Sequence, residues 1–256
     1  MKIYGLIGKT LHHSFSRRYF SEKFRSENLT DFQYKNFEIK NLAEQIPELK
    51  NNPELKGLNV TIPYKTEIIP FLDNVSEECR EINACNCIKI SGGKWTGYNT
   101  DIIGFEKSFT PFLKPFQQKA LILGTGGASN AVAFVLKKLN IDYVKVSRTK
   151  NLSDSVISYE DISEETMKDF QIVINTTPLG TFPNVDECPP LPYEFITAGH
   201  YFFDLIYNPA KTLFLSLAEK QGAFIENGDK MLVIQAEESW RIWDGNKWKG
   251  ESRGNN

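Results

Sequence analysis

Residues 120–131 read ALILGTGGASNA, and this stretch decides the fold of the chain. Its first four residues are apolar, as in a short buried strand, and the apolar residues after it are spaced as on one face of a helix. Gly124 permits a tight turn, and Gly126 lets a pyrophosphate approach the backbone. The spacing departs from G-x-G-x-x-G, because Ser129 stands at the third glycine position, and Gly127 and Ala131 supply the small residues. The helix that begins near Gly127 would present free N–H groups to an anion. The stretch therefore predicts a dinucleotide-binding strand–turn–helix unit.

The end of the next strand indicates which dinucleotide binds. A fold of this type that binds NAD usually has Asp or Glu about 20 residues further on, where it holds the ribose 2′-hydroxyl. Here the apolar run 143–146 continues into Ser147-Arg148-Thr149-Lys150, without a carboxylate. Two cations and a hydroxyl suit a 2′-phosphate. The pattern favours NADP(H) over NAD, and a solvated basic loop is the alternative.

Strands and helices alternate on both sides of this unit. Downstream, apolar runs alternate with helical patterns, a succession typical of a parallel, doubly wound sheet. Upstream, residues 1–100 alternate in the same way and end in two strands around SGGK at 91–94, which predicts a hairpin. The expected strands are 3–7, 32–39, 58–61, 85–90, 95–98, 120–123, 143–146, 172–174, 201–205 and 224–225, and the expected helices include 42–49, 101–109, 212–220, 231–243 and one that begins at Ser16. The fold class is α/β: an N-terminal α/β substrate lobe plus a Rossmann-like NADP-binding lobe, with a cleft between them.

Length and composition fit this organisation. The 256 residues correspond to slightly under two domains, and we expect residues 1–100, completed by 231–256, to form one domain and residues 101–230 the other. The formal net charge of −2 offers no basic excess for nucleic acid. No apolar run is long enough for a membrane span, and the N-terminus lacks the pattern of a signal peptide. Four cysteines are too few for a disulfide scaffold, which favours reduced thiols and a cytoplasmic location.

Polar side chains follow the predicted strands of the first lobe, where open α/β sheets bind ligands. They supply hydroxyl, amide, ammonium and carboxylate groups, which suit a small polyhydroxy acid, and they include no Ser–His–Asp arrangement. Each also has a structural alternative: Ser16, Thr100 or Asp101 as an N-cap, Asn86 as a turn former, and Lys65 as a surface cation. The set is Ser14, Ser16, Asn59, Thr61, Lys65, Asn86, Asn99, Thr100 and Asp101.

Several motifs, in order along the chain, resemble the shikimate dehydrogenase family. The resemblance extends from residue 3 to about residue 245, and GLNVTIPYK is its most specific element. The motifs are GLIG at 5–8, HSFS at 13–16, GLNVTIPYK at 57–65, GYNTDIIG at 97–104, GTGGA at 124–128, SRT at 147–149, NTTPLG at 175–180, DLIYNPAKT at 204–212 and NGDKMLVIQA at 227–236. Three positions depart from the family pattern: Arg17 replaces Pro, Cys87 replaces Thr and Ser147 replaces Asn.

The resemblance implies the reversible, NADPH-dependent reduction of 3-dehydroshikimate to shikimate, a step of chorismate and aromatic amino-acid biosynthesis. Lys65 and Asp101 match the family's catalytic pair: Lys65 would give the proton to the nascent alkoxide or stabilise it, and Asp101 would orient the ammonium and bind the substrate hydroxyl. The implied substrate-binding residues are Ser14, Ser16 and Tyr207 for the carboxylate, and Thr61, Asn86 and Gln235 for the ring hydroxyls. The cofactor-binding residues are Gly124, Gly126, Gly127, Ala128, Ser147, Arg148, Thr149, Lys150, Thr176 and Gly228.

Two other functions remain open at this stage. A quinate/shikimate dehydrogenase of the same family could use NAD(P), although Arg148 and Lys150 favour NADP. A non-catalytic dinucleotide-binding regulator could share the fold, although it has no need of a proton-transfer pair such as Lys65 and Asp101. We expect no bound metal, because no second ligand cluster accompanies the cysteines. The expected partner is a small-molecule substrate, not nucleic acid or a membrane, and the protein is expected to be a monomer or a homodimer.

Overall fold

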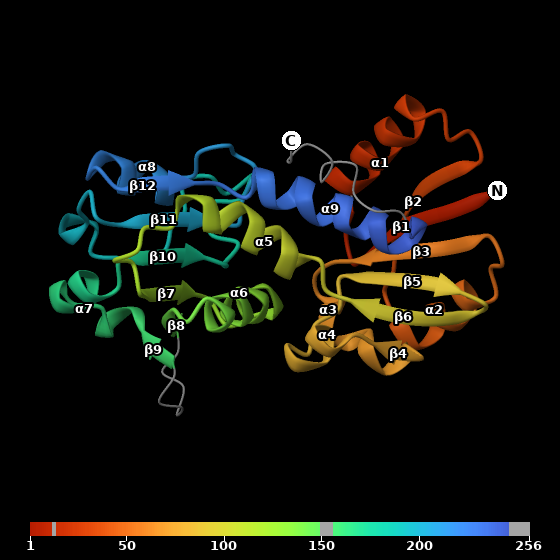
Figure 1. Cartoon of the computed structure of the whole chain (residues 1–256), viewed down its shortest axis with the longest axis horizontal. Helices are drawn as coiled ribbons and strands as arrows, with labels where there is room; N and C mark the ends of the chain where they lie inside the picture. Colours follow the sequence, from red (N-terminus) through yellow and green to blue (C-terminus); the bar gives the residue numbers. More distant parts are fainter. Residues whose placement is uncertain (12–13, 149–155, 246–256) are drawn as a thin grey trace, which may run out of the picture. The chain divides into compact units, whose positions relative to one another are not determined.

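A computed structural model describes residues 1–11, 14–148 and 156–245 of the chain (Figure 1). The chain divides into two compact units, one of residues 1–100 with the segment from Ala236 onward, and one of residues 101–235. We call them unit 1 and unit 2. The second crossing lies inside helix α9 (Asp229–Asp244), five residues beyond the predicted boundary at 230–231.

Unit 1 is built on a six-stranded mixed sheet in the order β2-β1-β3-β5-β6-β4. Strands β1, β2 and β3 are parallel, whereas β5 runs antiparallel to β3 and forms the predicted hairpin with β6. Gly92 and Gly93 have φ of 58° and 75°, which a tight hairpin turn requires. The strands are β1 (Lys2–Gly8), β2 (Phe32–Glu38), β3 (Leu55–Val60), β4 (Asn74–Val75), β5 (Cys87–Ser91) and β6 (Lys94–Tyr98), and the helices are α1 (Phe15–Ser26), α2 (Leu42–Lys50), α3 (Tyr64–Glu67), η1 (Ile69–Phe71) and α4 (Glu77–Glu81).

Two apolar layers enclose this sheet. On one face, α1 and the second half of α9 pack aromatic side chains against β1. Trp243 lies so close to Gly57 that a Cβ there would come within 2.4 Å of its ring, and its Nε1 donates to the Ile88 carbonyl. On the other face, Leu42 and Ile46 of α2 join the core. The sheet is thus buried on both sides, which leaves function to the ends of its strands.

Unit 2 has a parallel six-stranded sheet in the order β12-β11-β10-β7-β8-β9. Numbered from β7, this is the 3-2-1-4-5-6 order of the Rossmann fold, so the predicted fold class is confirmed. From β7, the next strands are added on one side of the sheet up to β9, and the strands from β10 onward are added on the other side of β7. This switch point is where such folds bind dinucleotides. The elements are α5 (Asp101–Phe109), η2 (Thr110–Phe112), β7 (Lys119–Leu123), α6 (Gly127–Lys138), β8 (Asp142–Ser147), β9 (Val156–Ser158), η3 (Tyr159–Asp161), α7 (Glu164–Asp169), β10 (Ile172–Asn175), η4 (Tyr193–Phe195), β11 (Tyr201–Asp204), α8 (Leu213–Lys220) and β12 (Phe224–Glu226).

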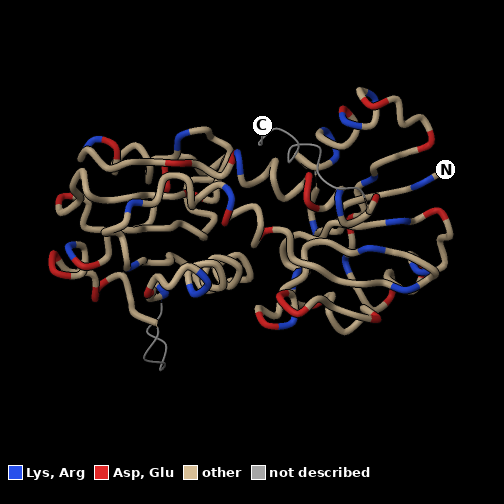
Figure 2. Tube along the Cα trace, viewed as in Figure 1, with Lys and Arg blue, Asp and Glu red and all other residues tan. Residues whose placement is uncertain are grey.

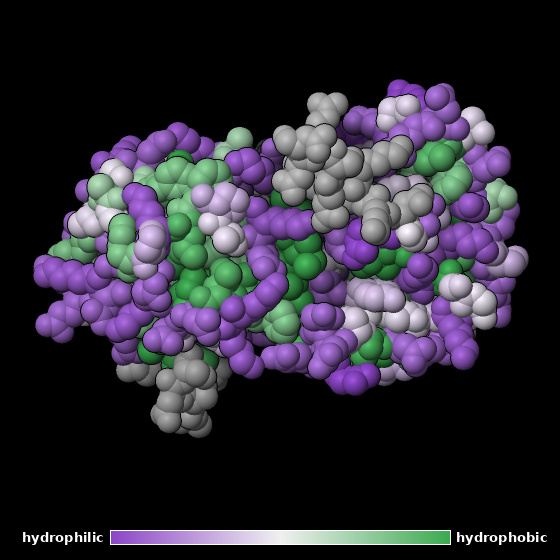
Figure 3. Space-filling model, viewed as in Figure 1, coloured by the Kyte–Doolittle hydropathy of each residue, from purple (hydrophilic) through white to green (hydrophobic). Residues whose placement is uncertain are grey.

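Helices cover both faces of this second sheet. Met167 of α7 and Phe214 of α8 belong to the core on one face. On the other face, Phe105 of α5 packs edge-on against Phe203 of β11, and α6 lies beside α5. Figure 3 shows hydrophilic side chains over most of the visible face of each unit, with apolar patches between them.

Charge is spread evenly over the chain. Figure 2 shows acidic and basic residues interspersed along both units, in keeping with the net charge of −2. Within the described ranges, no helix combines the length and apolar character needed to cross a membrane. The same residues contain no group of three or more His, Cys, Asp or Glu side chains placed to hold a metal ion.

Candidate active site

The position of Lys65 is set by the end of strand β3 and the short helix α3 that follows it. The strand ends at Val60, Thr61 donates its N–H to the Ile7 carbonyl, and the short helix α3 begins at Tyr64. The buried Tyr64 hydroxyl donates to the Ile39 carbonyl at 2.5 Å, which anchors the first turn of α3. The Lys65 carbonyl accepts from the Cys85 N–H at 2.7 Å. Lys65 is therefore a half-buried lysine on a backbone that is held on both sides, not a freely exposed surface cation.

Asn86 lies beside this segment, immediately before β5. Its carbonyl accepts from the Val60 N–H, and its own N–H donates to the Tyr98 carbonyl. Its side-chain Oδ1 accepts the Thr100 N–H at 2.7 Å and the Thr100 hydroxyl at 3.2 Å. Because Oδ1 faces these two donors, the amide presents Nδ2 as its donor group. Asn86 is thus a fixed side chain at the end of β3, not a turn former.

Cys87, the next residue, is one of the departures from the family pattern. The side chain is fully buried, and burial raises the pKa of its thiol to about 12. At neutral pH the group is a neutral thiol. It therefore replaces one uncharged side chain with another.

The two serines of the first motif stand at the start of α1. Ser14 is the N-cap, and its hydroxyl accepts the Arg17 N–H at 3.2 Å. The capping role that sequence reasoning offered for Ser16 thus belongs to Ser14. A proline at position 17 has no N–H, so Arg17 gives Ser14 a hydrogen bond that the family pattern lacks. Ser16 is the second residue of α1 and is half-buried.

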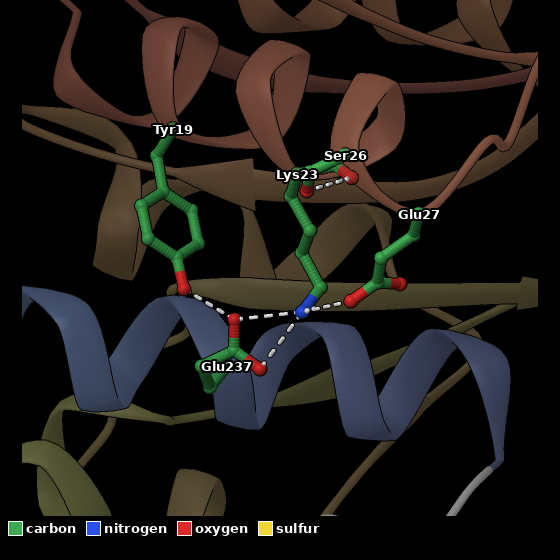
Figure 4. Close-up of polar contacts among 5 residues, drawn as sticks. All are labelled: Tyr19, Lys23, Ser26, Glu27 and Glu237. Atoms are coloured by element: carbon green, nitrogen blue, oxygen red, sulfur yellow. Dashed lines mark hydrogen bonds and ion pairs between the residues drawn. The ribbon is translucent and has the colours of Figure 1, made fainter.

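Polar side chains join helices α1 and α9 (Figure 4). The Glu237 carboxylate of α9 accepts a hydrogen bond from the Tyr19 hydroxyl. Both carboxylate oxygens also accept from Lys23 Nζ, at 2.9 and 3.1 Å. Lys23 also pairs with Glu27 at 3.1 Å. Burial, followed by the hydrogen bond to Glu237, raises the pKa of Tyr19, so its hydroxyl remains a donor at neutral pH. These contacts fix the position of α9 along α1.

In unit 2, the glycine turn lies between β7 and α6 as predicted. Gly124 has a φ of +111°, and a Cβ there would come within 2.7 Å of Thr176 Oγ1. Gly126 is the N-cap of α6, no side chain caps the helix there, and a Cβ at this position would meet nothing within 4 Å. The first turn of α6 contains no acidic residue. The turn therefore fits an anion such as a pyrophosphate on uncapped N–H groups.

The predicted 2′-phosphate residues follow β8. Ser147 ends the strand, half-buried, and Arg148 is exposed. Thr149 and Lys150 lie outside the described residues. On the same strand, Lys145 Nζ donates to Asn130 Oδ1 of α6 at 2.7 Å. Ala128 and Gly127 are half-buried in the first turn of α6, and Thr176 donates its hydroxyl to the Leu123 carbonyl.

Asp204 organises the neighbouring loops, and sequence reasoning assigned it no role. Its carboxylate accepts the Thr212 hydroxyl at 2.6 Å, the Ile206 N–H at 3.0 Å and Asn175 Nδ2 at 3.1 Å. It thereby holds the ends of β10 and β11 and the start of α8 together, next to Tyr207. The signal available in the sequence was an acidic residue at the end of an apolar strand.

Burial outweighs these three donors and raises the pKa of Asp204 to about 7. Near pH 4 the carboxyl is mostly protonated in the folded state, and that neutral form stabilises the fold. As pH rises from about 4 to about 7, the unfolded chain ionises first, so this contribution of up to about 4 kcal/mol is lost. We expect Asp204→Asn to remove that part of the pH dependence. Urea unfolding of both proteins between pH 4.5 and 8 measures it, and identical slopes would contradict the prediction.

Tyr207 and Gly228 belong to the same part of unit 2. The Ile206 carbonyl accepts the Gly228 N–H at 3.0 Å, which fixes the residue before Tyr207. A Cβ at Gly228 would come within 2.1 Å of the Leu205 carbonyl oxygen, so this position tolerates only glycine. Gly228, predicted to bind cofactor, therefore has a packing role that sequence reasoning did not identify. Tyr207 itself is 37% exposed.

Asp101 and Gln235 lie on the two helices of unit 2 that lead to the unit boundary. Asp101 is the first residue of α5 and Gln235 lies in the middle of α9, and both are buried. A Cβ at Gly104 would come within 2.8 Å of the Met231 carbonyl and 3.1 Å of the Gln235 Cβ, so the two helices pack closely here. Gln235 Nε2 donates to the Leu232 carbonyl of its own helix.

Comparison with known proteins is consistent across the whole chain. Residues 6–88 match the family model described as the shikimate dehydrogenase substrate binding domain. A shikimate dehydrogenase (NADP(+)) of Caldicellulosiruptor bescii is 39% identical over 95% of this chain and 89% of its own length. The crystal structure of shikimate dehydrogenase from Aquifex aeolicus is 34% identical, with a TM-score of 0.86 over 97% of this chain and 94% of that one.

A third relative was solved with ligands. Shikimate 5-dehydrogenase from Thermus thermophilus, in complex with NADP(H) and shikimate, is 27% identical with a TM-score of 0.83, over 96% of this chain and 94% of that one. The resemblance stated from the sequence motifs is thus confirmed.

Proposed function

This chain belongs to the shikimate dehydrogenase family, and we propose how its own residues perform the reversible, NADPH-dependent reduction of 3-dehydroshikimate to shikimate. It is an NADP-dependent oxidoreductase of aromatic biosynthesis that acts on a CH–OH group. One observation supports the assignment of residues: the backbones of Lys65 and Asn86 are both hydrogen-bonded near the end of β3. The Cys85 N–H donates to the Lys65 carbonyl, and the Val60 N–H donates to the Asn86 carbonyl.

Lys65 and Asp101 handle the proton. When bound, NADPH supplies the hydride to the carbonyl carbon. The Lys65 ammonium donates a proton to the carbonyl oxygen as it becomes an alkoxide, and in the reverse direction the Lys65 amine accepts it. The Asp101 carboxylate orients the ammonium and accepts a hydrogen bond from the substrate hydroxyl. Lys65 lies in unit 1, and Asp101 is the first residue of α5.

Six residues hold the substrate. Ser14 accepts the Arg17 N–H, which leaves its hydroxyl proton for the substrate carboxylate, together with Ser16 and Tyr207. Asn86 presents Nδ2 to a ring hydroxyl, because its Oδ1 is bonded to Thr100. Thr61 and Gln235 complete the hydroxyl contacts.

The glycine turn and the end of β8 hold the cofactor. The first turn of α6 would bind the pyrophosphate, with Gly126 leaving room for its approach. Ser147 and Arg148 would bind the 2′-phosphate, together with Thr149 and Lys150. Gly124, Gly127, Ala128, Thr176 and Gly228 shape the surrounding backbone.

One assay tests the proposed function. The purified protein is supplied with shikimate or quinate and with NADP⁺ or NAD⁺, and the reduced cofactor is followed by its absorbance. We expect shikimate with NADP⁺ to give the highest kcat/KM. Turnover with none of the four pairs would favour the regulator, and a clear preference for quinate with NAD⁺ would favour the quinate enzyme.

Arg148 is expected to decide the cofactor preference. Arg148→Gln should lower kcat/KM for NADP⁺ by about 10- to 100-fold, because a charge-assisted hydrogen bond to the 2′-phosphate is lost, while kcat/KM for NAD⁺ stays unchanged. Lys168→Gln is the control, since Lys168 is an exposed cation of unit 2 paired with Glu164. Equal losses with both cofactors would show that Arg148 does not recognise the 2′-phosphate.

We extend the proposal to the setting of the enzyme. The four cysteines are free, and three of them are buried, as suits a reducing compartment, so we place the protein in the cytoplasm as a monomer or homodimer. Its partner is the small-molecule substrate. Light scattering after gel filtration distinguishes the monomer from the homodimer.

A further inference from the structure

A chain of buried polar side chains runs through unit 1 beneath the proposed substrate site. The Tyr34 hydroxyl donates to Asn59 Oδ1 at 2.8 Å, and Asn59 Nδ2 donates to Ser239 Oγ at 2.9 Å. Ser239 Oγ lies 3.2 Å from Thr100 Oγ1, and the Thr100 hydroxyl donates to Asn86 Oδ1. Ser239 is fully buried and Thr100 is 1% exposed. Removing the hydrogen-bond partner of any member would therefore lower the free energy of unfolding.

The cluster lies where the chain leaves unit 1 and where it returns. Thr100 is the last residue of unit 1, directly before Asp101, and Ser239 follows the return at Ala236. Ser239 is four residues after Gln235 on α9, one helical turn away and on the same face of the helix. The hydroxyl groups of Thr100 and Ser239 are thus in contact near the two crossings, although these two residues are 139 positions apart in the sequence.

The hydrogen atoms can be placed consistently along the cluster. The Thr100 hydroxyl gives its proton to Asn86 Oδ1, so between Thr100 and Ser239 the donor is Ser239. Ser239 in turn accepts from Asn59 Nδ2. Each hydroxyl therefore fixes the next one, and the series ends on the side chain of Asn86.

We infer that Ser239 is a positioning residue of the reaction, because through Thr100 it orients the side chain of Asn86. The inference rests on the proposed function, because it assumes that Asn86 acts on the substrate. Ser239 does not touch the substrate itself. Its hydroxyl fixes the direction of the Asn86 amide and links α9, which carries Gln235, to that amide.

Ser239→Ala tests the inference. We expect kcat/KM for shikimate to fall by about 5- to 10-fold, since both hydrogen bonds of Ser239 in the buried series, with Asn59 and with Thr100, are lost, while KM for NADP⁺ stays within about twofold. Ser108→Ala is the control: Ser108 is also buried, but its hydroxyl bonds only to carbonyls of its own helix. An unchanged kcat/KM for shikimate in Ser239→Ala would overturn the inference.

A pair of variants at Thr100 keeps the test decisive if Ser239→Ala does not fold. Thr100→Val removes the hydroxyl with little change in shape, and Thr100→Ser retains it. We expect the loss of activity toward shikimate in Thr100→Val and near-normal activity in Thr100→Ser. Equal activity in the two variants would contradict a role for this hydroxyl.

A double mutant separates positioning from a general effect on the fold. If Ser239 acts through Asn86, adding Ser239→Ala to Asn86→Ala changes kcat/KM for shikimate by less than about twofold. A loss that multiplies with that of Asn86→Ala would show that Ser239 does not act through Asn86. Failure of the unsubstituted protein to oxidise shikimate would instead overturn the proposed function, so the two failures are distinguishable.

Discussion

Lys65→Ala is expected to lower kcat by about 10²- to 10⁴-fold, the usual contribution of a positioned proton donor, with KM for shikimate nearly unchanged. Lys65 is one half-buried residue on a backbone anchored by Cys85 and Tyr64, so removing its side chain leaves the support intact. A loss confined to the transition state appears in kcat and not in KM. Steady-state kinetics with NADP⁺ and shikimate measure both constants.

Two further variants sharpen this test. Lys65→Arg retains the positive charge, but a guanidinium does not release its proton near neutral pH, so we expect it to be nearly as inactive as Lys65→Ala. Lys56→Ala is the matched control, because Lys56 lies on β3 and its Nζ only bonds to the Pro53 carbonyl. A rise in KM equal to the whole loss of kcat/KM in Lys65→Ala would remove Lys65 from the proton transfer.

Gly126→Ala is expected to raise KM for NADP⁺ by about 10- to 100-fold, as a methyl group forced into a filled site does. In the free protein a Cβ at Gly126 meets nothing within 4 Å, and the backbone is extended with a φ of −81°. The fold therefore accepts alanine, and the free energy of unfolding should change by less than about 1 kcal/mol. The added methyl group instead occupies the space through which the pyrophosphate approaches α6.

Gly124→Ala separates the two roles of glycine in this turn. Gly124 has a φ of +111° and stands 2.7 Å, counted from an added Cβ, from Thr176 Oγ1. Alanine here should lower stability by about 1–3 kcal/mol as well as weaken NADP⁺ binding. Gly199→Ala is the control, because a Cβ there has only ordinary contacts. Chemical unfolding and cofactor titration measure the effects, and an unchanged KM for NADP⁺ in Gly126→Ala would refute the pyrophosphate assignment.

Elements with a strong local pattern were predictable from the sequence. The β5–β6 hairpin, β7 and α5 fall within two residues of their predicted ranges, because alternation, turn glycines and helical spacing are properties of neighbouring residues. Several short elements were missed, among them α7, β4 and β9. Helix α7 buries only Met167, so it shows no apolar period, and β4 and β9 contain two and three residues.

The candidate site divides in the same way. Sequence reasoning predicted roles for Lys65, Asn86 and the glycine turn, because each lies next to a recognisable strand. It left Asn59 without a role and did not find Ser239 or Asp204, whose partners are distant: Asn59 bonds to Ser239 across 180 residues, and Asp204 to Asn175 across 29. Such partners leave no trace in local spacing.

By itself the sequence determined the α/β class, the glycine turn at 124–127 between a strand and a helix, and the residue types available for proton transfer, since these depend on short-range periodicity and on the chemistry of single side chains. Only the tertiary structure decided the order of the strands, the crossing of α9 at Ala236, and the buried series from Tyr34 to Asn86. Those features depend on which distant segments pack together, and packing is a property of the whole folded chain and not of any window along it.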